Sequence, residues 1–71
     1  MAPLVIRYSA RQVALILCYA AAGNVARMAR RMGTSARELR RMMNGEAKPD
    51  RRVLAFLQLE QHGREYLWYP R

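Results

Sequence analysis

This 71-residue chain has few of the side chains that catalysis and metal binding require. It has one cysteine, Cys18, and one histidine, His62, which stand far apart in the sequence. A single cysteine excludes an intramolecular disulfide, and one histidine with one cysteine is too few for the usual zinc sites. No nucleophile has a partner base, and no glycine-rich phosphate loop is present. The sequence therefore predicts a protein that is not an enzyme and that carries no cofactor and no metal.

Long hydrophobic runs are also missing. The longest apolar stretch has ten residues, 13–22, whereas a membrane-spanning helix needs about twenty. This stretch leads directly into a basic, periodic segment, which disfavours a signal peptide. We therefore expect a cytoplasmic protein without a membrane-spanning segment.

Acidic residues are scarce. Five Asp and Glu stand against thirteen Lys and Arg, which gives a formal net charge of +8, and every basic residue except Lys48 is arginine. Such an excess favours a polyanionic partner, either nucleic acid or an anionic membrane surface. The first predicted helix has no basic flank along its polar side, and the next two have the turn signals of a folded domain, so we expect no membrane partner. The length allows one small domain, residues 1–71. A chain this short buries only roughly 60% of its unfolded surface, so its folded state should be marginally stable alone and we expect self-association to stabilise it.

Capping residues and apolar spacing predict four helices. Ser9 with Gln12, and Ser35 with Glu38, have the spacing of a capping box at a helix start. The predicted helices cover residues 10–22, residues 25–32, residues 36–43, and a segment that follows Asp50 and ends at His62-Gly63. In the last of these, the expected apolar stripe consists of Val53, Leu54, Phe56 and Leu57. The predicted fold class is therefore all-α, a small four-helix domain.

The two ends of the chain have an extended character. Residues 4–6 are apolar and partly β-branched, and residues 65–69 alternate in a way that suits a short strand. We expect these segments to pair as strands, either within one chain or between two chains. The tail, residues 64–71, is expected to form a dimer interface through four residues: Tyr66, Leu67, Trp68 and Tyr69.

Residues 25–44 have the spacing of a helix-turn-helix. A small residue at Ala29 lets two helices approach closely, and Gly33 permits a sharp turn that a side chain would strain. Leu39 and Met42, three residues apart, would anchor the second helix to the core. These features together predict a two-helix DNA-binding unit.

The second helix of this unit presents a basic face. Arg37, Arg40, Arg41 and Asn44 have spacings that place them opposite Leu39. Residues 24–45 contain six Arg and one Glu, a net charge of +5 out of the total of +8. Arginine binds guanine edges and phosphates in a bidentate manner, so this face is suited to a DNA groove. The alternative is an ordinary solvated surface in an arginine-rich protein. Arginine enrichment that is independent of position would spread these residues around the helix, whereas here they cluster opposite Leu39 and Met42.

Residues 25–45 read VARMARRMGTSARELRRMMNG and resemble the helix-turn-helix of the lambdoid-phage repressor and Cro (XRE-type) family. The resemblance extends over about residues 10–60 and implies a homodimeric DNA-binding protein, a phage- or prophage-type repressor on a palindromic operator. It implies base-reading roles for Ala36, Arg37, Arg40 and Arg41, and phosphate contacts at Asn24, Asn44 and Lys48. To these phosphate contacts we add Arg51, whose charge at a helix start opposes the helix dipole. Two residues depart from the family pattern, Val25 where Gln or Ser is usual and Ala36 where a polar reader is common.

A second class of function remains open. The same fold could bind a protein, as an antitoxin or as a phage-encoded inhibitor of a host nucleic-acid machine. The basic face would then meet an acidic patch on the partner or the rim of its nucleic-acid channel. A preference of about 10³ or more for one duplex over bulk DNA would distinguish a repressor from such a protein.

Overall fold

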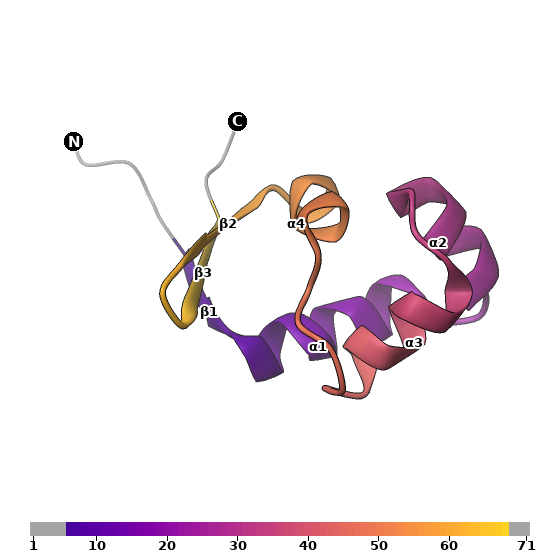
Figure 1. Ribbon diagram of the computed structural model, residues 1–71, viewed down its shortest axis with the longest axis horizontal. Helices are drawn as coiled ribbons and strands as arrows, with labels where there is room; N and C mark the ends of the chain where they lie inside the picture. Colours follow the sequence, from indigo (N-terminus) through magenta and orange to yellow (C-terminus); the bar gives the residue numbers. More distant parts are fainter. Residues whose placement is uncertain (1–5, 69–71) are drawn as a thin grey trace.

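The computed structural model describes residues 6–68. Within them the chain forms a strand, four helices and a hairpin (Figure 1). In chain order these elements are β1 (Ile6–Ser9), α1 (Ala10–Ala20), α2 (Val25–Met32), α3 (Ala36–Met43), α4 (Arg51–Leu57), β2 (Leu59–His62) and β3 (Glu65–Trp68). The structure is 54% helix and 19% strand. The fold is therefore α+β, and the all-α prediction is wrong.

The sheet has three antiparallel strands in the order β1-β3-β2. Ile6 pairs with Trp68 and Ser9 with Glu65, so the two ends of the described chain meet within one molecule. β2 and β3 form a hairpin whose two-residue turn begins at Gly63, with φ +61°, a conformation that glycine adopts without strain. Leu4, Val5 and Tyr69 were also expected in the terminal strands, and they lie outside the described residues.

β2 occupies a segment that was predicted to be helical. The fourth helix ends at Leu57 because Gln58 turns into the left-handed region, with φ +60° and ψ +40°. The prediction that His62 and Gly63 end this helix is therefore wrong. The sequence of β2, LEQH, consists of residues that favour helices or are neutral, so local propensity pointed the wrong way. Pairing with β3 over the core outweighs that propensity.

The predicted N-cap residues are confirmed, but only the first of the two predicted capping boxes forms: Ser35 accepts the backbone N–H of Glu38, and the Glu38 side chain makes no return bond to Ser35. Ser9 and Gln12 form a reciprocal capping box at the start of α1, with distances of 2.8 and 3.2 Å. The side chains of Asn24, Ser35 and Asp50 each accept a backbone N–H three residues later, at the starts of α2, α3 and α4. Each cap satisfies an amide that the helix itself leaves without a partner. The sequence therefore located every helix start, although α1 ends two residues earlier than expected.

The core lies between α1, the other helices and one face of the sheet. Figure 1 shows α1 running along the molecule, with the sheet at one end and α2 and α3 at the other. The buried side chains are Val13, Leu17, Ala21, Ala29, Met32, Leu39, Met42, Val53, Leu59 and Tyr66. In the predicted stripe of α4, Val53 is buried and Leu54 and Leu57 are half-buried, but Phe56 is 42% exposed, so its expected place in the core is wrong.

One face of the sheet packs on this core and the other faces outward. Tyr66 is 3% exposed on the inner face, and Trp68 is half-buried there beside its partner Leu59. On the outer face, Leu67 is flanked across the sheet by Arg7 and Glu60. The alternation predicted for the tail is therefore observed in β3, and its aromatic residues serve the core of their own chain.

No single helix within residues 6–68 has both the length and the apolar character for a membrane span. α1 and α2 meet that criterion only when taken together, and their axes are bent by 115° at the break between them.

Candidate nucleic-acid interface

α2, a tight turn and α3 form the two-helix unit predicted for residues 25–44. Gly33 ends α2 in the left-handed conformation, with φ +81°, and the N–H of Thr34 donates to the carbonyl of Ala29 at 2.9 Å. This is the hydrogen bonding of a glycine-terminated helix, in which a carbonyl without a helical partner is satisfied by the turn. Ala29 is buried, so α2 and α3 pack closely at this point. The roles predicted for Ala29 and Gly33 match this geometry.

α4 braces the turn from outside. The Arg52 guanidinium donates from Nη1 to the carbonyl oxygen of Gly33 at 2.8 Å. A Cβ atom built on Gly33 would lie 3.6 Å from Cδ of Arg52, so the arginine stem covers the turn at ordinary contact distance. No role was assigned to Arg52 in the sequence analysis. Nothing in its spacing indicated this partner, because Gly33 is nineteen residues away.

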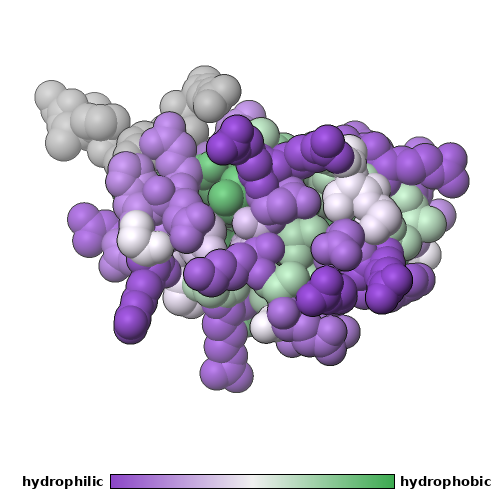
Figure 2. Space-filling model, viewed as in Figure 1, coloured by the Kyte–Doolittle hydropathy of each residue, from purple (hydrophilic) through white to green (hydrophobic). Residues whose placement is uncertain are grey.

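α3 has one buried and one exposed face. Leu39 and Met42 are buried and Met43 is half-buried, as the spacing predicted. On the other face Arg37, Arg40, Arg41 and Asn44 are all exposed. Figure 2 shows hydrophilic side chains projecting from the end of the molecule that α2 and α3 form. The structure therefore brings the predicted arginines together on one accessible helix face.

The arginines on α3 differ in their pairing. Nη1 of Arg41 lies 3.6 Å from Oε1 of Glu38, one turn earlier on the same helix. Within the described part of the chain, Arg37 and Arg40 make no ion pair with a carboxylate. These two guanidiniums keep their full hydrogen-bonding capacity for a ligand, whereas Arg41 must give up or share a carboxylate. Ala36, the fourth predicted reader, is half-buried against the core and offers only a methyl group.

The predicted phosphate contacts surround α3. Asn24 uses its Oδ1 atom to cap α2, so only the amide nitrogen of that side chain is left to donate to a phosphate. Asn44, Lys48 and Arg51 are exposed, the first at the end of α3, the second in the loop that follows and the third at the start of α4. All four are accessible.

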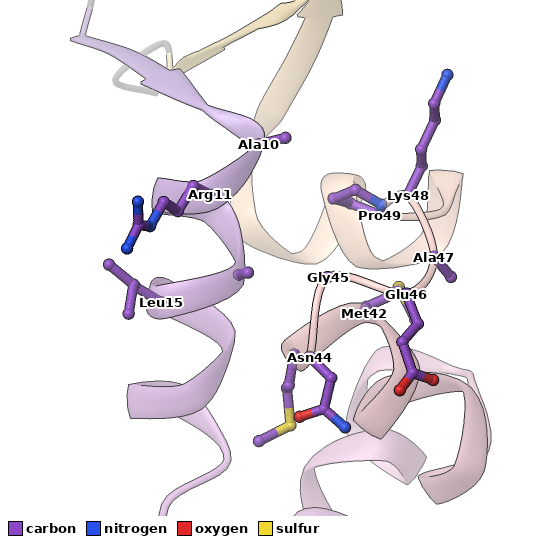
Figure 3. A pocket seen from close by; sticks show the side chains of 12 residues that line it. Ala10, Arg11, Leu15, Met42, Asn44, Gly45, Glu46, Ala47, Lys48 and Pro49 are labelled. Atoms are coloured by element: carbon purple, nitrogen blue, oxygen red, sulfur yellow. The ribbon is translucent and has the colours of Figure 1, made fainter.

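A groove lies between α1 and the loop from α3 to α4 (Figure 3). Its volume is about 510 Å³, and the lining is apolar around Ala14, Met43 and Pro49, with Arg11 and Lys48 among the charged residues. In Figure 3, Arg11 and Leu15 project from the side of α1 that faces away from this loop. The groove has no charged partner pair and no cluster of acids or bases suited to catalysis.

The charges of the molecule are unevenly distributed. Residues 24–45 carry six Arg and one Glu, net +5, whereas residues 59–68 carry two Glu and one Arg, net −1 with His62 neutral. On the sheet, Arg7 lies 3.9 Å from Glu65 and His62 lies 3.4 Å from Glu60. The helix-turn-helix end is therefore strongly basic, and the sheet end is close to neutral.

Within residues 6–68, no three His, Cys, Asp or Glu side chains come together as metal ligands. Cys18 is half-buried in α1, with its Sγ atom 3.8 Å from the carbonyl oxygen of Met43. Comparison of the chain with models of known families, with curated proteins and with solved structures gave no significant match.

Proposed function

We propose that this protein binds double-stranded DNA in a sequence-specific manner through α3, as a homodimeric repressor similar to the phage Cro proteins. The observation that carries the proposal is the exposed face of α3, on which Arg37 and Arg40 have no carboxylate partner within residues 6–68. Three arginines on one short helix repel each other, and a polyanion that accepts their hydrogen bonds would relieve that repulsion.

The proposed mechanism involves binding without chemistry. α3 would enter the major groove, where Arg37 and Arg40 would donate to the O6 and N7 atoms of guanine. Asn24, Asn44, Lys48 and Arg51 would contact the phosphates on both sides and fix the register of the helix. In a homodimer two such helices would lie about 34 Å apart, one turn of DNA, and would occupy the two halves of a palindrome. The bound protein would then block polymerase at the promoter.

The test is a selection of binding duplexes from a random library at about 150 mM salt, a concentration at which purely electrostatic binding is weak. We expect a palindromic consensus with half-sites about ten base pairs apart. Light scattering on the same complex should give two protein chains per duplex. The double variant Arg37→Ala/Arg40→Ala should select no consensus, whereas Arg64→Ala, in the hairpin turn, should select the wild-type sequence.

The absence of any consensus, with weak binding that depends steeply on salt, would contradict the proposal. In that case the basic face of α3 would have to meet a protein. A pull-down from host lysate, with the Arg37→Ala/Arg40→Ala variant as the control, would then identify the partner.

A further inference from the structure

The outward face of α1 is apolar, although it faces solvent. Leu15 is 53% exposed and Tyr19 is 83% exposed, and they lie one helical turn apart. Among the described residues only Ile6 and Phe56 are other large hydrophobic side chains with comparable exposure, and neither is on this helix. Arg11 is the one charged residue of α1, and it is exposed on the same side of the helix as Leu15 (Figure 3). A solvent-facing helix surface of this kind is typical of a contact with another molecule.

The spacing of this stripe is symmetric. Arg11, Leu15 and Tyr19 follow one another at intervals of four residues, so Leu15 is at the centre with Arg11 and Tyr19 about 6 Å to either side along the axis. A two-fold axis that passes through Leu15, perpendicular to α1, would set the α1 helices of two copies antiparallel to each other. Each Arg11 then lies level with the Tyr19 of the partner, twice in the same interface. A guanidinium over a tyrosine ring is a favourable cation–π contact, so the stripe is complementary to itself.

We propose that a second copy of this chain docks on α1, with Leu15 on the two-fold axis and Arg11 stacked on Tyr19 of the other copy. The neighbouring residues leave room for this contact. Ala14, next to Leu15 on α1, carries only a methyl group and does not obstruct the approach of a second helix.

The sheet is less suited to the same role. β3, which contains most of the tail expected at the dimer interface, is the central strand and is hydrogen-bonded on both sides within its own chain. Tyr66 is buried, and the outer face of the sheet presents Arg7, Glu60, His62 and Glu65 around a single half-buried Leu67. Docking on α1 leaves these pairs intact and uses side chains that are already exposed.

This inference rests on the homodimer of the proposed function, but it is tested without DNA. The two can therefore fail separately: a protein that dimerises through α1 and selects no operator would retain this interface and lose the repressor function. A protein that binds an operator but is monomeric without DNA would retain the repressor function and lose this interface.

The first experiment measures self-association of the full chain by sedimentation equilibrium. We expect wild type to form a dimer, Leu15→Gln and Tyr19→Ala to weaken it at least tenfold, and Phe56→Gln to leave it unchanged. Phe56 is the matched control because it is an exposed apolar residue on another helix. Circular dichroism of each variant confirms that it is folded. A wild-type protein that is monomeric at about 1 mM would overturn the proposal, as would a dimer weakened by Phe56→Gln and not by Leu15→Gln.

The second experiment locates the axis. In a Cys18→Ser background, a short bismaleimide should cross-link two copies of the Leu15→Cys variant at position 15. A residue on a two-fold axis lies opposite the same residue of the other copy. Phe56→Cys in the same background is the control and should give only monomer. Efficient cross-linking of Phe56→Cys and none of Leu15→Cys would place the interface elsewhere.

A third measurement addresses the Arg11–Tyr19 contact. Arg11→Gln and Tyr19→Leu should each weaken the dimer about tenfold, since each removes both copies of the cation–π pair. The double variant should lose little more than either single variant, because the second change has no partner left to remove. Fully additive losses would show that the two residues do not meet across the interface.

Discussion

At the scale of single residues, Gln58 is held in an unfavourable conformation. Its φ of +60° is the only positive value at a non-glycine residue among those described, and it occurs where α4 changes into β2. A left-handed conformation costs an ordinary residue about 1 kcal/mol or more, whereas glycine adopts it freely. Gln58→Gly should therefore raise the free energy of unfolding by about 0.5–1 kcal/mol, after allowance for the greater freedom of glycine in the unfolded chain.

Urea unfolding followed by circular dichroism would measure this gain. The matched control is Ala55→Gly, an exposed position inside α4, which should lose about 1 kcal/mol because glycine is a poor helix former. If both substitutions destabilise the protein to the same degree, Gln58 is not strained.

Arg37 and Arg40 are the residues on which base recognition is expected to depend. Replacement of either by alanine should cost about 1–3 kcal/mol on the selected operator and broaden the bases accepted at one position. Fluorescence anisotropy with the operator and with a random duplex would measure both effects. Equal losses on the two duplexes would make these arginines phosphate contacts instead of base readers. Arg41→Ala should cost less than either, because its guanidinium already shares Glu38.

At the scale of secondary-structure elements, the sequence predicted well what depends on local signals. The starts of α1 to α4 follow from Ser9, Asn24, Ser35 and Asp50, since a cap needs only residues within one turn. α2 and α3 have the predicted bounds because Gly33 and Gly45 both adopt the left-handed conformation where a helix must stop. The exposed arginine face of α3 follows from the same helical periodicity.

The elements that depend on distant contacts could not be predicted in this way. β2 has a helix-compatible sequence and becomes a strand only because β3 pairs with it and Leu59 is buried. The one local signal was Gly63, which with Arg64 suits a two-residue hairpin turn, but His62-Gly63 was interpreted as the end of a helix. In the candidate site, the hydrogen bond from Arg52 to Gly33 was missed for the same reason, because it joins two elements that the sequence separates.

That hydrogen bond gives a prediction at the element scale. Arg51→Met and Arg52→Met both remove a cation from the start of α4, where it opposes the helix dipole. Only Arg52→Met also removes the donor to the Gly33 carbonyl. We therefore expect Arg52→Met to be less stable than Arg51→Met by about 0.5–1 kcal/mol, the usual contribution of an exposed hydrogen bond.

Urea unfolding of the two variants would give this difference directly, and hydrogen exchange of the Thr34 amide would place it in the turn. Equal stabilities with unchanged exchange would show that the brace contributes nothing.

At the scale of the whole molecule, the uneven distribution of charge predicts opposite salt dependences for DNA binding and for self-association. Residues 24–45, at net +5, would bind DNA phosphates and release counterions. Each cation that contacts a phosphate should therefore make the negative slope of log K against log salt steeper by about 0.9. Lys48→Met and Arg51→Met should each reduce that slope by about 0.9, on operator and random duplex alike. Arg64→Met, in the hairpin turn, should leave it unchanged.

Self-association should respond to salt in the opposite direction. Two copies of a chain with net charge +8 repel each other at low ionic strength, and salt screens that repulsion over a Debye length of about 10 Å at 0.1 M. The contacts proposed across α1 are apolar and cation–π in character, and salt weakens them little by comparison. Sedimentation equilibrium at about 50 and 300 mM salt should therefore show a tighter dimer at the higher concentration, while DNA binding becomes weaker over the same range. A dimer that weakens with salt would indicate an interface held by ion pairs, such as those on the outer face of the sheet, and would argue against α1.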